Sequence, residues 1–462
     1  MSFPAYPDYK NSGVEWLGDV PAQWEIKAFR RVIQKSLSNG IFKKKEDFGR
    51  GVLLINVFDI YRHNFKVDYL SLDRVDCNAA ELVSYAVDAG DLFFVRSSLK
   101  YEGISVVAVA DSCLEAVVYE CHLIRARPNS AFFDGRYGSY LFNSTIYRAI
   151  MISKAKLTTM TTIDQEAISS TLIPVPALYE QTQIARFLDH ETARIDALIE
   201  EQQRLIELLK EKRQAVISHA VTKGLDSTVP MKDTGVEWLG EVPAHWEVGG
   251  LTRFIGPVVD YRGRTPTKVD DGIFLVTARN IRNGRIDYEA SEEYADPESA
   301  ESLLARGRPE IGDLLFTMEA PLGQVALIDR TDIALAQRIV KFRGEASVMR
   351  NHYLMFWFMS TNCQARLETL ATGSTALGIK SSKLGMIECL APTLNEQDAI
   401  VSHIQRESEK NDALVYEAEN VIGLLQERRS ALISAAVTGK IDVRGWQPPA
   451  SASTPELEQE AV

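Results

Sequence analysis

The sequence lacks several patterns by which metalloproteins, membrane proteins and secreted proteins are recognised. Its five cysteines are scattered without a Cys-x-x-Cys pair, and its seven histidines are spread thinly, so no zinc site is predicted. No apolar run reaches the ~20 residues that a membrane span needs. Residues 1–10 show no basic-then-apolar leader. We therefore expect a cytoplasmic protein with reduced thiols and no bound metal.

The sequence also lacks the motifs of the enzymes that act on DNA. It contains neither the Gly-rich cofactor turn nor the Asn/Asp-Pro-Pro-Tyr/Phe loop expected of an adenine methyltransferase. Residues 373–383 resemble a phosphate loop, but an isoleucine separates the second glycine from the lysine, so ATP binding is not predicted. Asp19, Glu25 and Lys27 have a spacing that suggests a nuclease, but a second copy of this segment does not keep the set. No catalytic residue is predicted.

The charge balance gives little support to nucleic-acid binding by the whole chain. The formal net charge is −12, which opposes attraction to phosphates. Residues 1–175 carry 20 basic and 20 acidic side chains, so the remainder carries the whole excess. Local clusters such as residues 43–45 can still form a basic face.

An internal repeat is the strongest feature of the sequence. Residues 13–25 (GVEWLGDVPAQWE) recur as residues 235–247 (GVEWLGEVPAHWE), 222 positions later. Further segments match at an offset of 222 and then of 216: 90–94 with 312–316, 178–181 with 394–397, and 217–222 with 433–438. These matching segments form a common frame, whereas the sequences between them differ in the two copies. This favours two related but different binding specificities over a fused homodimer with a single function.

Each copy ends in a segment that predicts a long amphipathic helix. Residues 180–222 contain no proline or glycine, and apolar residues recur at intervals of three, four and seven. Such a helix is about 64 Å long at ~1.5 Å per residue. Residues 396–438 repeat the pattern, with Asn411 where the first copy has Ile195. We expect the two helices to pack as an antiparallel pair whose outer surface docks other subunits.

The segments before the helices predict two mixed α/β domains. Short β-rich runs alternate with turn signals, and helical stretches are expected at 140–153 and 353–361. The tryptophans of the repeated frame are interpreted as core residues rather than base-stacking platforms. The predicted class is α+β with a pseudo-twofold internal repeat. The expected boundaries are 1–173 and 225–389 for the domains, 174–224 and 390–438 for the helices, and 439–462 for a disordered tail.

Several polar loops have the composition of DNA-contacting segments. They mix Arg, Lys, Asn and Ser with Gly, the types that contact base edges and phosphates. Solvated loops without a ligand are the alternative for any single residue. The candidates in the first copy are Lys43, Lys44, Lys45, Arg62, Asn64, Arg96, Ser98, Lys100, Lys154 and Lys156. Those in the second copy are Arg262, Arg264, Thr265, Arg279, Asn280, Arg282, Thr375, Lys380 and Ser382.

Three repeated features together are specific for one protein family. They are the twin Gly-Val-Glu-Trp-Leu-Gly units, the twin Gly-Asp-Leu units and the twin Glu-Gln pairs that open the helices. With them, nearly the whole chain resembles the specificity subunit of a type I restriction–modification system. The resemblance implies that each domain reads one half of a bipartite double-stranded DNA site and that the helices set the spacing between the halves. It implies no catalytic activity and no cofactor in this chain.

The resemblance also implies partners. Two modification subunits with S-adenosylmethionine methylate adenine, and restriction subunits with ATP and Mg²⁺ can join them. Two alternatives stay open from the residues alone: a coiled-coil scaffold without DNA contact, and a standalone nuclease.

Overall fold

The computed structural model describes residues 3–157, 160–261, 266–373 and 377–448, which form two compact units. Unit 1 comprises Met1–Gln202 and Asn420–Val462, and unit 2 comprises Gln203–Glu419. Each unit therefore contains one mixed α/β domain and part of each long helix. Among the described residues, no helix is both long enough and apolar enough to cross a membrane.

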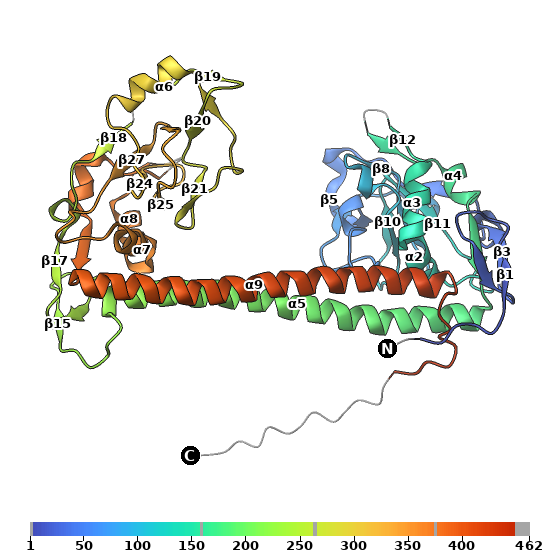
Figure 1. Ribbon diagram of the computed structural model, residues 1–462. Coiled ribbons are helices and arrows are strands. Elements are labelled where there is room, and N and C mark those ends of the chain that lie inside the picture. The colour runs from blue at the N-terminus through green and yellow to red at the C-terminus, as the bar shows by residue number, and fades with distance from the viewer. Residues whose placement is uncertain (1–2, 158–159, 262–265, 374–376, 449–462) are drawn as a thin grey trace. The chain divides into compact units, whose positions relative to one another are not determined.

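Unit 1 is built on an antiparallel sheet and a smaller sheet with a parallel pair (Figure 1). The first has the order β4 (Ser38–Asn39), β11 (Leu123–Ala126), β7 (Leu92–Val95), β9 (Val107–Val109). The second has the order β10 (Val117–Tyr119), β5 (Phe48–Ile55), β6 (Asp73–Val75), with β10 parallel to β5. Short ladders join β1 (Tyr9–Asn11) to β2 (Asp19–Pro21), β3 (Glu25–Ala28) to β14 (Leu172–Val175), and β12 (Lys156–Leu157) to β13 (Thr161–Thr162) and β8 (Ser97–Ser98). The domain helices are α1 (Ala79–Ser84), α2 (Gly135–Asn143), α3 (Thr145–Ser153) and α4 (Gln165–Ser169).

Unit 2 repeats this plan. Its antiparallel sheet has the order β18 (Val259–Asp260), β27 (Ile339–Phe342), β24 (Leu314–Thr317), β25 (Val325–Leu327). Its second sheet has the order β19 (Lys268–Val269), β23 (Tyr294–Ala295), β20 (Ile273–Val276), β26 (Ile333–Leu335), with β20 parallel to β26. Short ladders join β15 (Met231–Asp233) to β16 (Glu241–Pro243), β17 (Glu247–Gly250) to β28 (Glu388–Ala391), and β21 (Ile281–Arg282) to β22 (Arg285–Ile286). Its domain helices are α6 (Pro297–Leu304), α7 (Asn351–Met359) and α8 (Thr361–Leu370).

The repeated Gly-Asp-Leu segment is a turn that leads into a buried strand. Gly90 has φ +90°, a left-handed conformation that favours glycine. All four residues of β7 are buried. Leu92 and Phe94 belong to one apolar cluster while Phe93 and Val95 belong to another, because alternate side chains of a strand point to opposite faces. A strand buried on both faces gives the continuous apolar run seen in the sequence.

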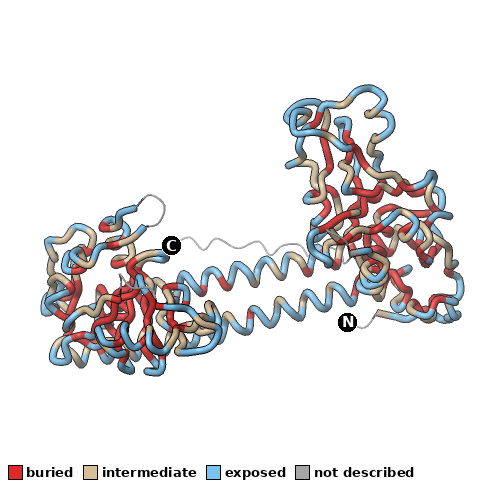
Figure 2. The backbone as a smooth tube through the Cα atoms, turned by 90° about the horizontal axis from the view of Figure 1, so that it is seen from above, coloured by how far each residue is buried: buried red, intermediate tan, exposed pale blue. Residues whose placement is uncertain are grey.

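The two long helices are present as predicted: α5 is Leu178–Lys223 and α9 is Leu394–Val437. Exposed residues dominate their central parts, with buried residues recurring among them (Figure 2). In unit 1 Asp196 of α5 pairs with Arg429 of α9 at 2.8 Å. In unit 2 Arg213 of α5 pairs with Asp412 of α9 at 3.2 Å. The first half of α5 thus contacts the second half of α9 and the reverse, so the helices are antiparallel.

The helical stretches predicted at 140–153 and 353–361 are present, and each contains a break at a serine. Ser144 has an extended backbone, ψ 150°, and separates α2 from α3. Ser360, with ψ 147°, separates α7 from α8. Serine hydroxyls bond to nearby backbone, and this competes with helix continuation. The sequence pattern predicts the helical stretches but not the breaks at the two serines.

The Glu-Gln pair that opens each long helix anchors the adjacent domain. Trp24 Nε1 donates to Glu180 at 2.9 Å in unit 1, and Trp246 Nε1 donates to Glu396 at 3.4 Å in unit 2. Both tryptophans are buried, which confirms them as core residues. The following glutamines have no exposed surface and bond backbone groups of the domain loops. These contacts account for the strict repetition of the motif.

Replacing Gln181 by methionine is expected to destabilise unit 1 by roughly 2–4 kcal/mol. The Gln181 amide accepts from the Asp134 N–H and donates to the Phe132 and Pro176 carbonyls, each at 2.9 Å. Methionine fills similar space but leaves these polar groups unpaired, at about 1–3 kcal/mol for each buried one. Urea unfolding followed by tryptophan fluorescence measures the change. The control is the exposed Gln203, whose change to methionine is expected to stay within about 0.5 kcal/mol; equal midpoints for the two variants would contradict the prediction.

The prediction of a disordered tail is wrong for residues 439–448, which pack in unit 1. Val443 is buried, and the Asp442 N–H donates to the Pro4 carbonyl at 2.7 Å. Trp446 packs edge-on against Phe187 of α5, with ring centroids 5.3 Å apart. The packing of Trp446 and Val443 orders this segment, although its Pro, Gly and charged residues suggest disorder. Residues 449–462 lie outside the described residues.

Candidate nucleic-acid interface

The lysine run of the first domain is only partly available to a ligand. Lys43 donates to Glu81 at 2.8 Å, and its side chain is 11% exposed. This hydrogen bond raises the pKa of the Lys43 ammonium. Lys44 lies 4.0 Å from Glu46 and is exposed, and Lys45 is exposed at the start of a short 3-10 helix. Lys43 is therefore a structural residue, because its charge is already neutralised by a neighbour.

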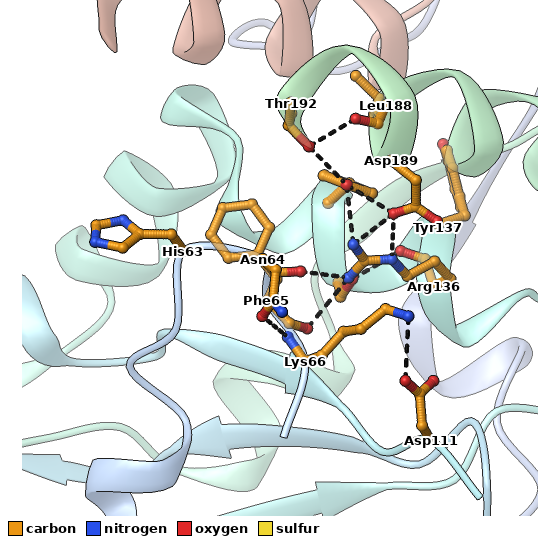
Figure 3. Close-up of polar contacts among 12 residues, drawn as sticks. His63, Asn64, Phe65, Lys66, Asp111, Arg136, Tyr137, Leu188, Asp189 and Thr192 are labelled. Carbon is orange, nitrogen blue, oxygen red and sulfur yellow. Dashed lines mark hydrogen bonds and ion pairs between the residues drawn. The ribbon is translucent and has the colours of Figure 1, made fainter. Parts of the chain in front are cut away.

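Asn64 lies in a loop that is tied to α5 through Arg136 (Figure 3). Its side chain accepts from the Lys66 N–H at 3.1 Å, and its carbonyl accepts from Arg136 at 2.7 Å. Arg136 also donates to Asp189 of α5 at 2.8 Å, and the nearby Arg62 pairs with Asp68 at 3.3 Å. The Asn64 amide closes a local turn, since Asn side chains readily bond backbone two residues on. Its assignment to DNA contact is therefore weakened.

The segment from Arg96 to Lys100 begins at the end of β7. The Arg96 guanidinium donates to the Cys121 carbonyl at 3.2 Å. Ser98 is 8% exposed, and its hydroxyl accepts from the Lys100 N–H at 3.2 Å. Lys100 is exposed. Of the three predicted residues, Lys100 has the accessibility that a phosphate contact requires.

The two lysines that follow α3 differ in role. Lys154 donates to the Thr171 hydroxyl at 2.7 Å and to the Ala167 carbonyl at 3.2 Å. Burial lowers the pKa of its ammonium. Lys156 is exposed and pairs with Asp164 at 3.0 Å. An exposed pair of this kind contributes little and opens readily, so Lys156 is available to a ligand and Lys154 holds α4 in place.

In the second domain Arg279 is exposed, whereas the predicted DNA-contacting residue Asn280 is buried. Asn280 has no exposed surface, and its amide donates to the Asp287 and Ser291 carbonyls, each at 2.9 Å. Arg282 donates to Asp287 at 2.9 Å from an exposed position. Lys380 and Ser382 are exposed. Four predicted residues lie outside the described residues: Arg262, Arg264, Thr265 and Thr375.

The comparisons with known proteins cover almost the whole chain. Residues 84–209 match the family model of the type I restriction modification DNA specificity domain. The putative type I restriction enzyme MjaX specificity subunit of Methanocaldococcus jannaschii is 23% identical over 443 residues, 93% of this chain and 96% of the relative. The EcoKI specificity subunit of Escherichia coli strain K12 is 23% identical over 468 residues, 95% of this chain and 93% of the relative. The chain is thus similar to type I restriction–modification specificity subunits over almost its whole length.

Solved structures show the same fold. The HsdS subunit of Thermoanaerobacter tengcongensis superposes with a TM-score of 0.53 at 15% identity, covering 91% of this chain and 98% of that one. A chain from a structure of complex assembly and conformational transition in a type I R-M system gives 0.63 at 16% identity, covering 90% and 98%. The predicted fold class is confirmed. The family model and the relatives named as specificity subunits also bear out the predicted specificity function and the predicted non-catalytic role.

Sequence reasoning missed the ion pairs behind the Gly-Asp-Leu units. Asp91 is 1% exposed and accepts from Arg127 at 2.7 Å. In the second domain Asp313 accepts from Lys341 at 2.6 Å and Arg343 at 2.8 Å. The signal was available, because an aspartate repeated in both copies beside a buried strand needs a basic partner. The two aspartates are too buried to bind DNA, and their ion pairs stabilise the domains.

Among the described residues, one trio has the composition of a metal site. Glu120, Cys121 and His122 each offer a ligand atom, and the three atoms lie within 4.8 Å of one another. Burial raises the pKa of the Cys121 thiol, which opposes the thiolate that a metal requires. The Glu120 carboxylate also accepts from the Val57 N–H at 2.8 Å. The trio therefore carries no metal assignment.

Proposed function

We propose that this specificity subunit selects a bipartite double-stranded DNA site, with residues 1–173 and 225–389 each reading one half. The observation that carries the proposal is the similarity to specificity subunits over almost the whole chain, in a protein whose two domains share one frame. The exposed parts of that frame differ between the copies, which fits two different half-sites. The five cysteines are all free, which fits a reducing cytoplasm.

The long helices are proposed to set the spacing between the half-sites and to dock the modification subunits. Each helix contributes to both units, so its length links the two domains. Large apolar side chains also remain exposed along both helices, beyond those that the helix pair buries: Leu198, Leu205, Leu208, Leu414, Val421 and Leu424. Exposed apolar side chains at helical spacing are typical of a surface that another helix covers.

The partner subunits are proposed to supply the chemistry. Two modification subunits would carry S-adenosylmethionine, and two restriction subunits with ATP and Mg²⁺ would complete a restriction enzyme. This chain itself is proposed to bind no cofactor. The net charge of −12 supports a division of labour in which the partners contribute much of the attraction to DNA phosphates.

Methylation mapping of the host genome with and without this chain tests the proposal. We expect adenine methylation at one bipartite sequence to disappear when the gene is deleted and to return when it is restored. The control is a deletion of the neighbouring modification gene, which is expected to remove the same sequence from the methylated set. Methylation that persists in the absence of this chain contradicts the proposal.

A further inference from the structure

Two turns in each domain lie at the ends of the parallel strands. In the first domain β5 and β10 are parallel and lead into residues 56–59 and 120–122. In the second domain β20 and β26 are parallel and lead into residues 277–280 and 336–338. We call these segments the paired turns. Neighbouring parallel strands end at the same edge of a sheet, so each pair of turns lies side by side.

The paired turns have the same backbone hydrogen bonds in both domains. The second turn is held to the end of the first parallel strand by Glu120 N–H to Ile55 O at 3.0 Å, and by Ala336 N–H to Val276 O at 2.9 Å. It is also held to the end of the central strand by Arg96 N–H to His122 O at 2.7 Å, and by Met318 N–H to Arg338 O at 2.8 Å. His122 and Arg338 therefore occupy the same place in the frame.

The first turn is closed by an equivalent buried side chain. Asp59 accepts from the Asn56 N–H at 2.8 Å, and Asn280 accepts from the Thr277 N–H at 2.9 Å. Both acceptors are buried. The residue before each acceptor, Phe58 or Arg279, therefore occupies an equivalent position in the two domains.

The exposed side chains on this common frame have diverged. Phe58 is 81% exposed where the second domain has the exposed Arg279. His122 is exposed where the second domain has the exposed Arg338. The frame does not need these differences for packing, because its hydrogen bonds are the same in both copies. Exposed positions that change chemistry on a shared frame are those expected to set different DNA preferences.

The second domain carries two arginines at one hollow. Arg279 and Arg338 line it together with residues of both paired turns, and its volume is about 230 Å³. Arg338 has φ +79°, in the left-handed region that an arginine rarely adopts. Such a conformation costs of order 1–3 kcal/mol and is typical of functional positions. Arginine forks bind the O6 and N7 atoms of guanine in the major groove.

Both guanidinium groups are available to bind a ligand. Within the part of the chain that the structure describes, no hydrogen bond or ion pair of the Arg279 side chain is found. Arg338 pairs with Glu319 at 2.9 Å, with the two side chains 48% and 44% exposed. An ion pair this exposed contributes about 0–1 kcal/mol, so exchanging it for a base contact costs little.

We propose that the paired turns are the base-reading surface of each domain, and that Arg279 and Arg338 recognise guanines in the half-site of the second domain. The inference rests on the proposed function, since it assigns residues within a domain already proposed to read DNA. The first domain presents Phe58 and His122 at the same places. Phenylalanine contacts the methyl group of thymine, so the two half-sites differ in composition at the equivalent positions.

The test uses the full chain in complex with its modification subunits and a DNA library randomised in both half-sites. The variants are R338N and R279Q; asparagine is chosen at 338 because it tolerates a positive φ. Each variant is expected to lower the preference for guanine at one position of one half-site by about 5- to 150-fold. The other half-site is expected to stay unchanged. The matched control is R308Q, because Arg308 is also an exposed arginine of the second domain and pairs with Glu301 as Arg338 pairs with Glu319.

The outcomes separate the inference from the function on which it rests. If both variants keep their base preferences and methylate specifically, the paired turns are not the base-reading surface. The proposed function is then unaffected. A uniform loss of methylation on all sequences also overturns the inference, since it assigns the arginines to phosphates or to folding. A wild-type complex that methylates without any sequence preference contradicts the proposed function itself.

Discussion

Replacing residues 1–176 by the corresponding segment of a related specificity subunit is expected to change one half of the methylated sequence and leave the other half unchanged. The physical reason is that each domain has its own apolar core and its own polar surface. The structure moves the junction from residue 173 to 176, because β14 (Leu172–Val175) pairs with β3 inside the first domain. With the junction before α5, both strands of this ladder come from the same parent protein. Methylation mapping of the exchanged protein in the host measures the result.

The reciprocal exchange is the control. Replacing residues 225–392 keeps the ladder between β17 and β28 within one parent and is expected to alter the other half-site alone. Both exchanges retain the Glu-Gln pair that opens each long helix, so the domains can bond to Gln181 and Gln397 as before. An exchange that alters both half-sites, or neither, shows that the domains do not read DNA independently. The expected effect is a complete change of preference at several base pairs, at about 1–3 kcal/mol each.

The duplication and the long helices could be predicted from the sequence because both depend on many residues at once. A helix of more than 40 residues repeats its apolar pattern through many turns, so single exceptions such as Asn411 do not hide it. The frame was visible because both copies need the same packing around Trp24 and Trp246. The break at Ser144 depends on one hydroxyl and the ordered tail on Val443 and a tryptophan, so a pattern averaged over a window does not resolve them.

The candidate site could be predicted only in part, because composition does not show which polar groups are already paired. Lys43 and Lys154 have the residue type of a phosphate contact, but each has a partner within the fold. Asn280 lies in a run of arginines and is nevertheless a buried turn residue. Arg338 was missed because it follows an apolar strand without other basic residues. Its position beside Arg279 depends on two parallel strands that are far apart in sequence.

Inserting four residues into each long helix is expected to abolish methylation at the natural site and to create a new optimum with a longer spacer. The antiparallel register identifies matched insertion points. Arg213 follows Asp196 by 17 residues on α5, and Asp412 precedes Arg429 by 17 residues on α9. An insertion after Gln202 therefore corresponds to one after Ile422. Four residues lengthen a helix by about 6 Å, which corresponds to one or two base pairs at ~3.4 Å each. Libraries with spacers of varied length, methylated by the assembled complex, measure the new optimum.

A matched insertion of two residues separates spacing from simple disruption. Two residues add about 3 Å but turn the following helix by roughly 200°, because one turn contains 3.6 residues. This moves the apolar stripe to the wrong face, so pairs such as Asp196–Arg429 and Arg213–Asp412 can no longer both form. We expect the two-residue variant to methylate no spacer length, whereas the four-residue variant recovers on a longer one. A four-residue variant that still prefers the natural spacer shows that the half-site distance is set by the partner subunits or by the DNA rather than by these helices.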